Sequence, residues 1–201
     1  MSLQKLLPRL TLVLALAFTT SAFAQQTKIT ESGETTVDLA ASFLSALQTL
    51  GVTPGVIGPT QLNGVKVNFP ITSGAIDLDT ALGNIDHSGG LTLTAGSTVV
   101  SIQNFIIDTT GSAPVITGLA SVNGGLVGRI PLFDLTLPSS FKLPLKLSSS
   151  VLLNICSVGV TLDATAAKTL NKVFDTTALK GGFTIGTANV QAFTNGWQSE
   201  K

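Results

Sequence analysis

Residues that usually carry chemistry are scarce in this sequence of 201 residues. It has one cysteine, one histidine and one tryptophan, and it has no tyrosine. A zinc site needs several histidine or cysteine ligands, so the composition argues strongly against one. A single cysteine, Cys156, also means that the chain has no internal disulfide. We expect Cys156 to be a small buried residue in the apolar run 151–156, the alternative being a disulfide with another chain.

Charged side chains are also few, at 11% of the residues against about 25% in typical globular proteins. Eleven basic residues balance eleven acidic ones, so the formal net charge is zero. Removal of the first 24 residues would take away two cations and no acid. A nearly neutral or slightly acidic chain is a poor partner for nucleic acid or for anionic lipid, since both are bound through a basic surface. We therefore expect no nucleic-acid partner.

The first 24 residues have the pattern of a cleaved signal peptide. Lys5 and Arg9 precede a short apolar run over 10–18, and Ala22-Phe23-Ala24 supplies small residues at the two positions that signal peptidase reads. The apolar run is shorter than the roughly 20 residues needed to span a bilayer. We therefore predict an exported protein that is periplasmic, cell-surface or extracellular, with no transmembrane segment in the mature chain.

Two short helices are predicted, each with one apolar face packed on a sheet. The first covers residues 36–50 and begins at a capping box in 35–38. The second follows Asp163, a residue type that often caps helix N-termini. Phe43 in the first helix and Leu170 in the second are expected to be nearly fully buried. The apolar residues that recur at helical spacing are Leu39, Phe43, Ala46, Leu47 and Leu50 in the first helix, and Ala166, Ala167, Leu170, Val173 and Phe174 in the second.

Strands are predicted between the helices and after the second one. In 65–69, 91–95 and 99–107, apolar residues alternate with polar ones, which is typical of strands with one exposed face. Glycine pairs at 89–90 and 124–125 mark turns, and neither has the spacing of a phosphate-binding loop. Short, regularly punctuated strands predict a mainly β fold, an antiparallel β-sandwich with the two helices packed on it. The predicted division is a signal peptide over 1–24, a loose segment over 25–34, one β domain over 35–195 and a tail over 196–201.

Candidate catalytic and metal-binding groups are few. Asp86-His87-Ser88 contains the residue types of a Ser-His-Asp site, but neighbours on a strand point to opposite faces and cannot form a triad among themselves. Asp77 and Asp79 are two residues apart on a predicted strand, so both carboxylates are expected on one face of it. They could begin a Ca²⁺ site, which needs several oxygen ligands, or they could lie at a solvated strand edge near a turn. We expect no enzymatic activity, no resident cofactor and no metal.

Two stretches of the sequence resemble a known family. Residues 67–74 (VNFPITSG) lead to 83–93 (GNIDHSGGLTL), and a later run extends from Val160 to Ala188. This pattern resembles HtaA-like domains of bacterial secreted and cell-surface proteins, as a divergent and uncharacterised branch. The resemblance implies a β-sandwich with short helices. It also implies haem binding through a tyrosine supported by a histidine; His87 matches the histidine, whereas the tyrosine has no counterpart.

The sequence therefore favours an exported, non-catalytic β domain that acts by binding or by surface packing. Its partner would be an unknown component of the cell envelope or a small apolar ligand. The alternative is a carrier of haem or of a small apolar ligand, of HtaA-like type but without the tyrosine ligand. His87 is the candidate ligand-binding residue in that case, and otherwise has a structural role in a turn.

Overall fold

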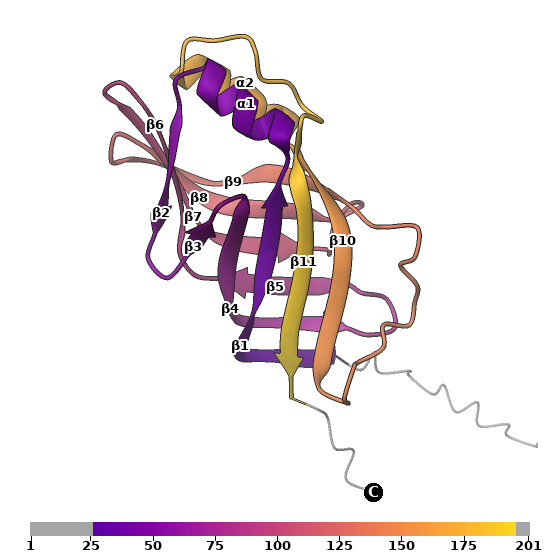
Figure 1. Cartoon of the computed structure of the whole chain (residues 1–201). Coiled ribbons are helices and arrows are strands. Elements are labelled where there is room, and N and C mark those ends of the chain that lie inside the picture. Colours follow the sequence, from indigo (N-terminus) through magenta and orange to yellow (C-terminus); the bar gives the residue numbers. More distant parts are fainter. Residues whose placement is uncertain (1–25, 196–201) are drawn as a thin grey trace, which may run out of the picture.

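The chain folds into a barrel of antiparallel strands with two helices at one end (Figure 1). The computed structural model describes residues 26–195, with side chains from residue 32 onward. The predicted signal peptide and tail lie outside this range. The elements in chain order are β1 (Gln26–Leu39), α1 (Ala41–Thr49), β2 (Thr53–Ile57), β3 (Gln61–Asn63), β4 (Lys66–Asp77), β5 (Gly83–His87), β6 (Gly90–Ala95), β7 (Thr98–Asp108), β8 (Val115–Val122), β9 (Gly125–Thr136), β10 (Leu152–Leu162), α2 (Ala164–Val173) and β11 (Thr184–Thr194).

The barrel closes because β7 pairs with β5 on one side and with β8 on the other. The closed path runs β7-β5-β4-β1-β11-β10-β9-β8, which makes eight strands. β6 and β2 extend the sheet from β7, and β3 pairs with β4. The predicted mainly β, antiparallel fold with two helices is confirmed. The strands form one continuous sheet, however, so the arrangement differs from the two separate sheets of the predicted sandwich.

The first strand corrects the prediction for the N-terminal part of the domain. Residues 26–34, predicted to be loose, and the predicted capping box at 35–38 both belong to β1, which pairs with β4 and β11. Thr35 and Val37 are buried at alternate positions, as a strand requires. A bulge at Gly33 has a φ of +124°, and a Cβ there would lie 2.3 Å from the Gln191 carbonyl oxygen. Only glycine fits this close approach between two strands.

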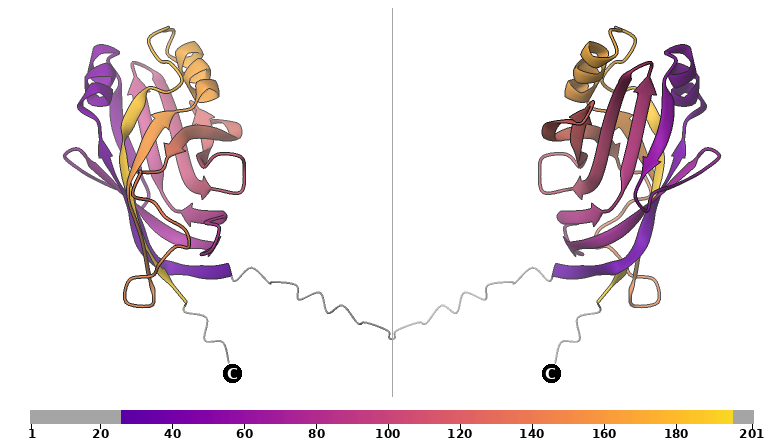
Figure 2. Two further views of the ribbon diagram at one scale, coloured as in Figure 1. Left: turned by 90° about the vertical axis from the view of Figure 1, so that its right-hand side faces the viewer. Right: turned by 90° about the vertical axis from the view of Figure 1, so that its left-hand side faces the viewer.

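The two helices begin in different ways. α1 covers only residues 41–49 of the predicted 36–50, and its N-cap residue, Ala40, makes no side-chain hydrogen bond. The Ala40 amide instead donates to the Ile185 carbonyl of β11 at 2.9 Å. α2 begins as predicted, since the Asp163 carboxylate accepts hydrogen bonds from the amides of Thr165 and Ala166 at 2.7 and 3.0 Å. Both helices lie at the same end of the barrel, where they stand apart from each other (Figure 2).

The prediction that Cys156 is buried was wrong, because its side chain is exposed. The register of β10 against β11 shifts between Ile155 and Val158, and Ser157 has a φ of +61°. This bulge takes residues 156 and 157 out of the inward-outward alternation of the strand. The Cys156 thiol lies 3.1 Å from the Asn154 side-chain oxygen on the outer surface. An apolar run alone does not reveal such a bulge.

Candidate functional site

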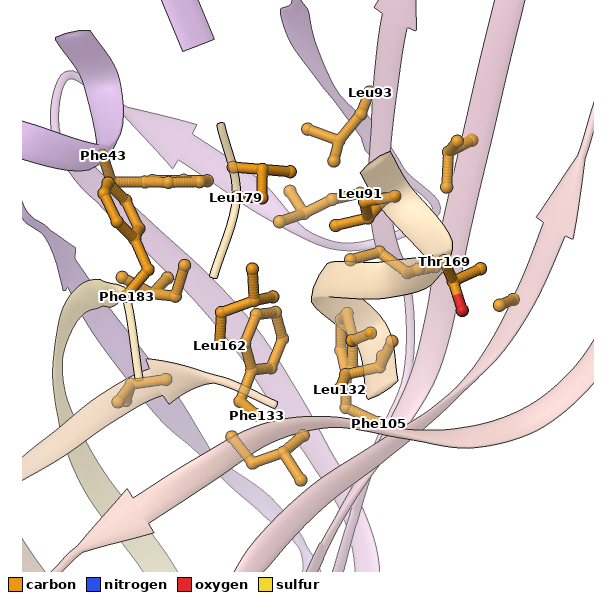
Figure 3. Close-up of a pocket in the computed structure, with 18 of the residues that line it drawn as sticks. Phe43, Leu91, Leu93, Phe105, Leu132, Phe133, Leu162, Thr169, Leu179 and Phe183 are labelled. Atoms are coloured by element: carbon orange, nitrogen blue, oxygen red, sulfur yellow. The ribbon is translucent and has the colours of Figure 1, made fainter. Parts of the chain in front are cut away.

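A cavity of about 120 Å³ lies between the two helices and the barrel (Figure 3). Its walls combine side chains of α1 and α2 with those of the surrounding strands, and the segment that leads from α2 to β11 also contributes. The space therefore exists because the helices stand over the barrel end without filling it. The lining residues labelled in Figure 3 are Phe43, Leu91, Leu93, Phe105, Leu132, Phe133, Leu162, Thr169, Leu179 and Phe183.

The cavity wall is almost entirely apolar. Among the residues that the structure describes, Thr35, His87 and Thr169 line the cavity with polar side chains, and no charged residue lines it. Aliphatic and aromatic side chains make up the rest. A concave apolar surface with few polar groups is the usual form of a small-molecule site.

Phe43 and Leu170 were predicted to be nearly fully buried, and this was wrong. Both are only partly buried, and both line the cavity. The buried helix residues are Leu47 of α1 and Ala166 and Ala167 of α2, which are 6%, 1% and 2% exposed. Helical spacing correctly identified the apolar faces, but part of each face borders the cavity rather than the sheet.

His87 is the only sequence-predicted site residue that reaches the cavity wall. It ends β5 and is 5% exposed. Its Nδ1 lies 3.3 Å from the Phe105 carbonyl oxygen, and its Nε2 lies 2.7 Å from the Thr35 hydroxyl. A carbonyl oxygen can only accept, so Nδ1 carries the proton and Nε2 accepts from Thr35. Burial lowers the pKa of His87 to about 4, so the imidazole is neutral at pH 7.

Thr35 is the partner that sequence reasoning missed. It was assigned to a capping box, whereas it faces inward from β1 and meets a histidine 52 residues away. The alternation of Thr35 with Val37 was the available signal for an inward-facing strand position. No sequence signal indicated the hydrogen bond between Thr35 and His87, because this contact depends on how β1, β4 and β5 come together in the sheet.

The residues next to His87 in the sequence do not form a catalytic triad with it. Asp86 accepts hydrogen bonds from the Ser73 hydroxyl at 2.7 Å and from the Asn84 side-chain amide at 3.3 Å. Because neighbouring side chains alternate along a strand, Asp86 lies on the face of β5 opposite to His87. Residues 86–88 therefore form no nucleophile–base–acid chain.

Asp77 and Asp79 do not share a strand face. Asp77 ends β4, and its carboxylate accepts hydrogen bonds from the amides of Asp79 and Thr80 at 2.8 and 2.9 Å. The hydrogen bond from the Thr80 amide contributes most to lowering the pKa of Asp77 below its usual value, and the bond from the Asp79 amide also lowers it. Asp79 is exposed in the turn. Within residues 26–195, no group of three or more histidine, cysteine or acidic residues is placed to hold a metal ion.

Comparison with known proteins identifies the fold. No protein-family model matches the sequence, and no curated protein matches it significantly. Among solved structures, the C-terminal domain of HtaA from Corynebacterium glutamicum is similar, with a TM-score of 0.65 and 16% identity over 84% of this chain and 99% of that domain. The N-terminal domain of HtaA gives a TM-score of 0.60 and 14% identity over 83% of this chain and 99% of that domain.

A third similar structure is the heme binding protein HtaB of the same organism. Its TM-score is 0.54, with 10% identity over 85% of this chain and 96% of HtaB. The chain therefore has an HtaA-like fold, and the predicted resemblance is confirmed. In the described part of the chain, neither helix has the length and apolar character needed to cross a membrane.

Proposed function

We propose that this chain is an exported, non-catalytic binding protein that holds a small apolar ligand between α1, α2 and the barrel. The observation that carries the proposal is the apolar cavity of about 120 Å³ whose lining includes no charged residue. The HtaA-like fold supports it, since one protein of this fold is named for binding heme. The signal-peptide pattern of residues 1–24 supports export.

The partly buried helix side chains favour a ligand over a simple packing gap. Phe43 and Leu170 border the cavity and retain solvent exposure. Each apolar Å² that a ligand removes from water stabilises the complex by about 25 cal/mol. A ligand in this space would cover both side chains at once, because they approach it from different helices.

The residues of this chain do not fit haem as the ligand. Both ring nitrogens of His87 are engaged, by Thr35 and by the Phe105 carbonyl, and the ring is enclosed. The chain has no tyrosine to serve as an alternative iron ligand. We therefore expect haemin to give the same visible spectrum with the wild-type protein and with His87→Ala. An absorption band that appears with the wild type and is lost in His87→Ala would contradict this expectation.

A pair of tryptophan variants tests the cavity as the binding site. Leu170→Trp places a larger side chain on the cavity wall, while Lys168→Trp places the same side chain on the exposed face of α2. Native mass spectrometry and organic extraction of the purified full chain would first show whether a small molecule is retained. Delipidated protein would then be titrated with that molecule, or with toluene, and followed by its melting temperature.

We expect Leu170→Trp to abolish the ligand-induced rise in melting temperature and Lys168→Trp to keep it. Equal rises in both variants would show that the ligand binds elsewhere. No rise for any apolar compound with the wild type would reject the proposed function.

Export is tested separately: we expect material recovered outside the cytoplasm to begin near Gln25, and retention of residues 1–24 there would contradict the predicted processing.

A further inference from the structure

The polar side chains of the cavity wall are already paired within the protein. The Thr35 hydroxyl and both nitrogens of His87 are linked to each other and to the Phe105 carbonyl, as described above. The Thr169 hydroxyl donates to the Thr165 carbonyl one turn earlier in α2, at 2.9 Å. The wall therefore offers a ligand no unpaired side-chain donor of its own.

This pairing determines which chemical groups of a ligand can bind inside the cavity. A hydroxyl, amine or carboxylate that enters it gives up its hydrogen bonds to water, and the polar atoms of Thr35, His87 and Thr169 contribute no exposed surface to the cavity with which it could replace them. No lysine, arginine or ionised histidine is among the lining residues to balance a negative charge, and no acid is there to balance a positive one. Such groups are stable only outside the cavity, where they remain in water.

The volume sets an upper size for the group that enters. A cavity of about 120 Å³ is close to the ~150 Å³ of an engineered apolar cavity that remains dry and binds benzene. One aromatic ring or one short branched alkyl group fills such a space. A fused multi-ring molecule would require α1 and α2 to move apart.

We infer that the part of the ligand inside the cavity is an uncharged hydrocarbon group, of about one aromatic ring in size, without hydrogen-bonding atoms. This inference deepens the proposed function and rests on it. It makes the cavity selective by exclusion: the protein discriminates against polar groups because its own polar side chains are already satisfied.

The test uses pairs of compounds with matched shape. Toluene and phenol differ by a methyl group against a hydroxyl, and so do ethylbenzene and benzyl alcohol. The delipidated full chain is titrated with each compound, and affinities are taken from the rise in melting temperature and from calorimetry. We expect phenol and benzyl alcohol to bind roughly 10- to 100-fold more weakly than toluene and ethylbenzene, which is the discrimination typical of an apolar pocket against an added polar group.

Leu170→Trp serves as the site control, and its response to toluene and ethylbenzene should disappear. Equal affinity for the two members of each pair, with loss of binding in Leu170→Trp, would overturn the inference while leaving the proposed function standing. If neither hydrocarbon binds the wild type, both the inference and the proposed function fail. Tighter binding of phenol or benzyl alcohol would show that an unpaired polar group lines the site, and would also overturn the inference.

Discussion

At the scale of single residues, His87 joins three strands in its neutral form. It belongs to β5, accepts from Thr35 of β1 and donates to the Phe105 carbonyl of β7. A protonated ring could not accept from the Thr35 hydroxyl, and it would place a charge in an apolar interior. The same residue that the sequence offered as a ligand is thus part of the packing of the barrel.

His87 should make the stability of the protein depend on pH. Its pKa is about 4 in the folded protein and about 6.5 in an unfolded chain. The unfolded state therefore binds more protons between these values, so the contribution of His87 to stability is complete above pH 6.5 and is lost as the pH falls to about 4. The loss is roughly 3 kcal/mol.

Urea unfolding of the wild type and of His87→Gln between pH 4 and 8 measures this contribution. Carboxylates also titrate in the lower part of this range, and they do so in both proteins. We expect the free energy of unfolding to fall further in the wild type than in His87→Gln. Parallel curves for the two proteins would show that His87 does not titrate in the way that its burial requires.

Leucines in the core and at the cavity should respond differently to truncation. Leu153 is 1% exposed in the core, while Leu170 is partly buried at the cavity. Leu153→Ala should cost about 3–5 kcal/mol, in the upper part of the range for a fully buried leucine. Leu170→Ala should cost at least about 1 kcal/mol less, because its side chain already borders empty space. Chemical denaturation of both variants checks the order, and equal costs would mean that Leu170 packs tightly.

At the scale of elements, the two helices differ in how their first turn is stabilised. α2 has the Asp163 cap, whereas α1 begins at Ala40 without a side-chain cap, although its φ and ψ of −68° and 140° suit one. We expect Asp163→Ala to lower stability, and Ala40→Ser to raise it, by about 0.5–2 kcal/mol each. Asp163→Asn is the matched control, since it keeps an oxygen acceptor. Thermal melts that show no loss for Asp163→Ala would contradict this role.

The sequence correctly predicted those elements whose local residue pattern indicates the same secondary structure that they have in the fold. The alternating strands and the second helix, with its cap at Asp163, follow from such patterns. β1 was not predicted from such a pattern, because residues 35–39 are compatible with a helix or a strand, and only the pairing with β4 and β11 on both sides makes them a strand. Cys156 was misplaced because a bulge depends on the register of the neighbouring strand. The cavity could not be predicted, since a gap between helices and sheet leaves the apolar pattern unchanged.

At the scale of the whole molecule, stability should come from the closed sheet and its core. The single thiol, Cys156, is exposed, and the described residues include no cluster suited to a metal. We therefore expect dithiothreitol and EDTA to leave the melting temperature within about 2 °C. A loss of about 1 kcal/mol shifts the midpoint by ~2–4 °C in a domain of this size, so a larger fall would show an intermolecular disulfide or a bound metal.

The position of β11 between β1 and β10 has a consequence for how the chain acquires its structure. Val37 and Ala188 are register partners, although 151 positions separate them along the chain. Synthesis proceeds from the N-terminus, so β1 cannot pair with β11 until the eleven strands and helices between them have been made. Contacts between such distant segments form slowly, because loop-closure entropy is lost before they stabilise the fold. During that delay β1 and β10 have open edges, and a chain in this state is poorly protected against association with its own copies.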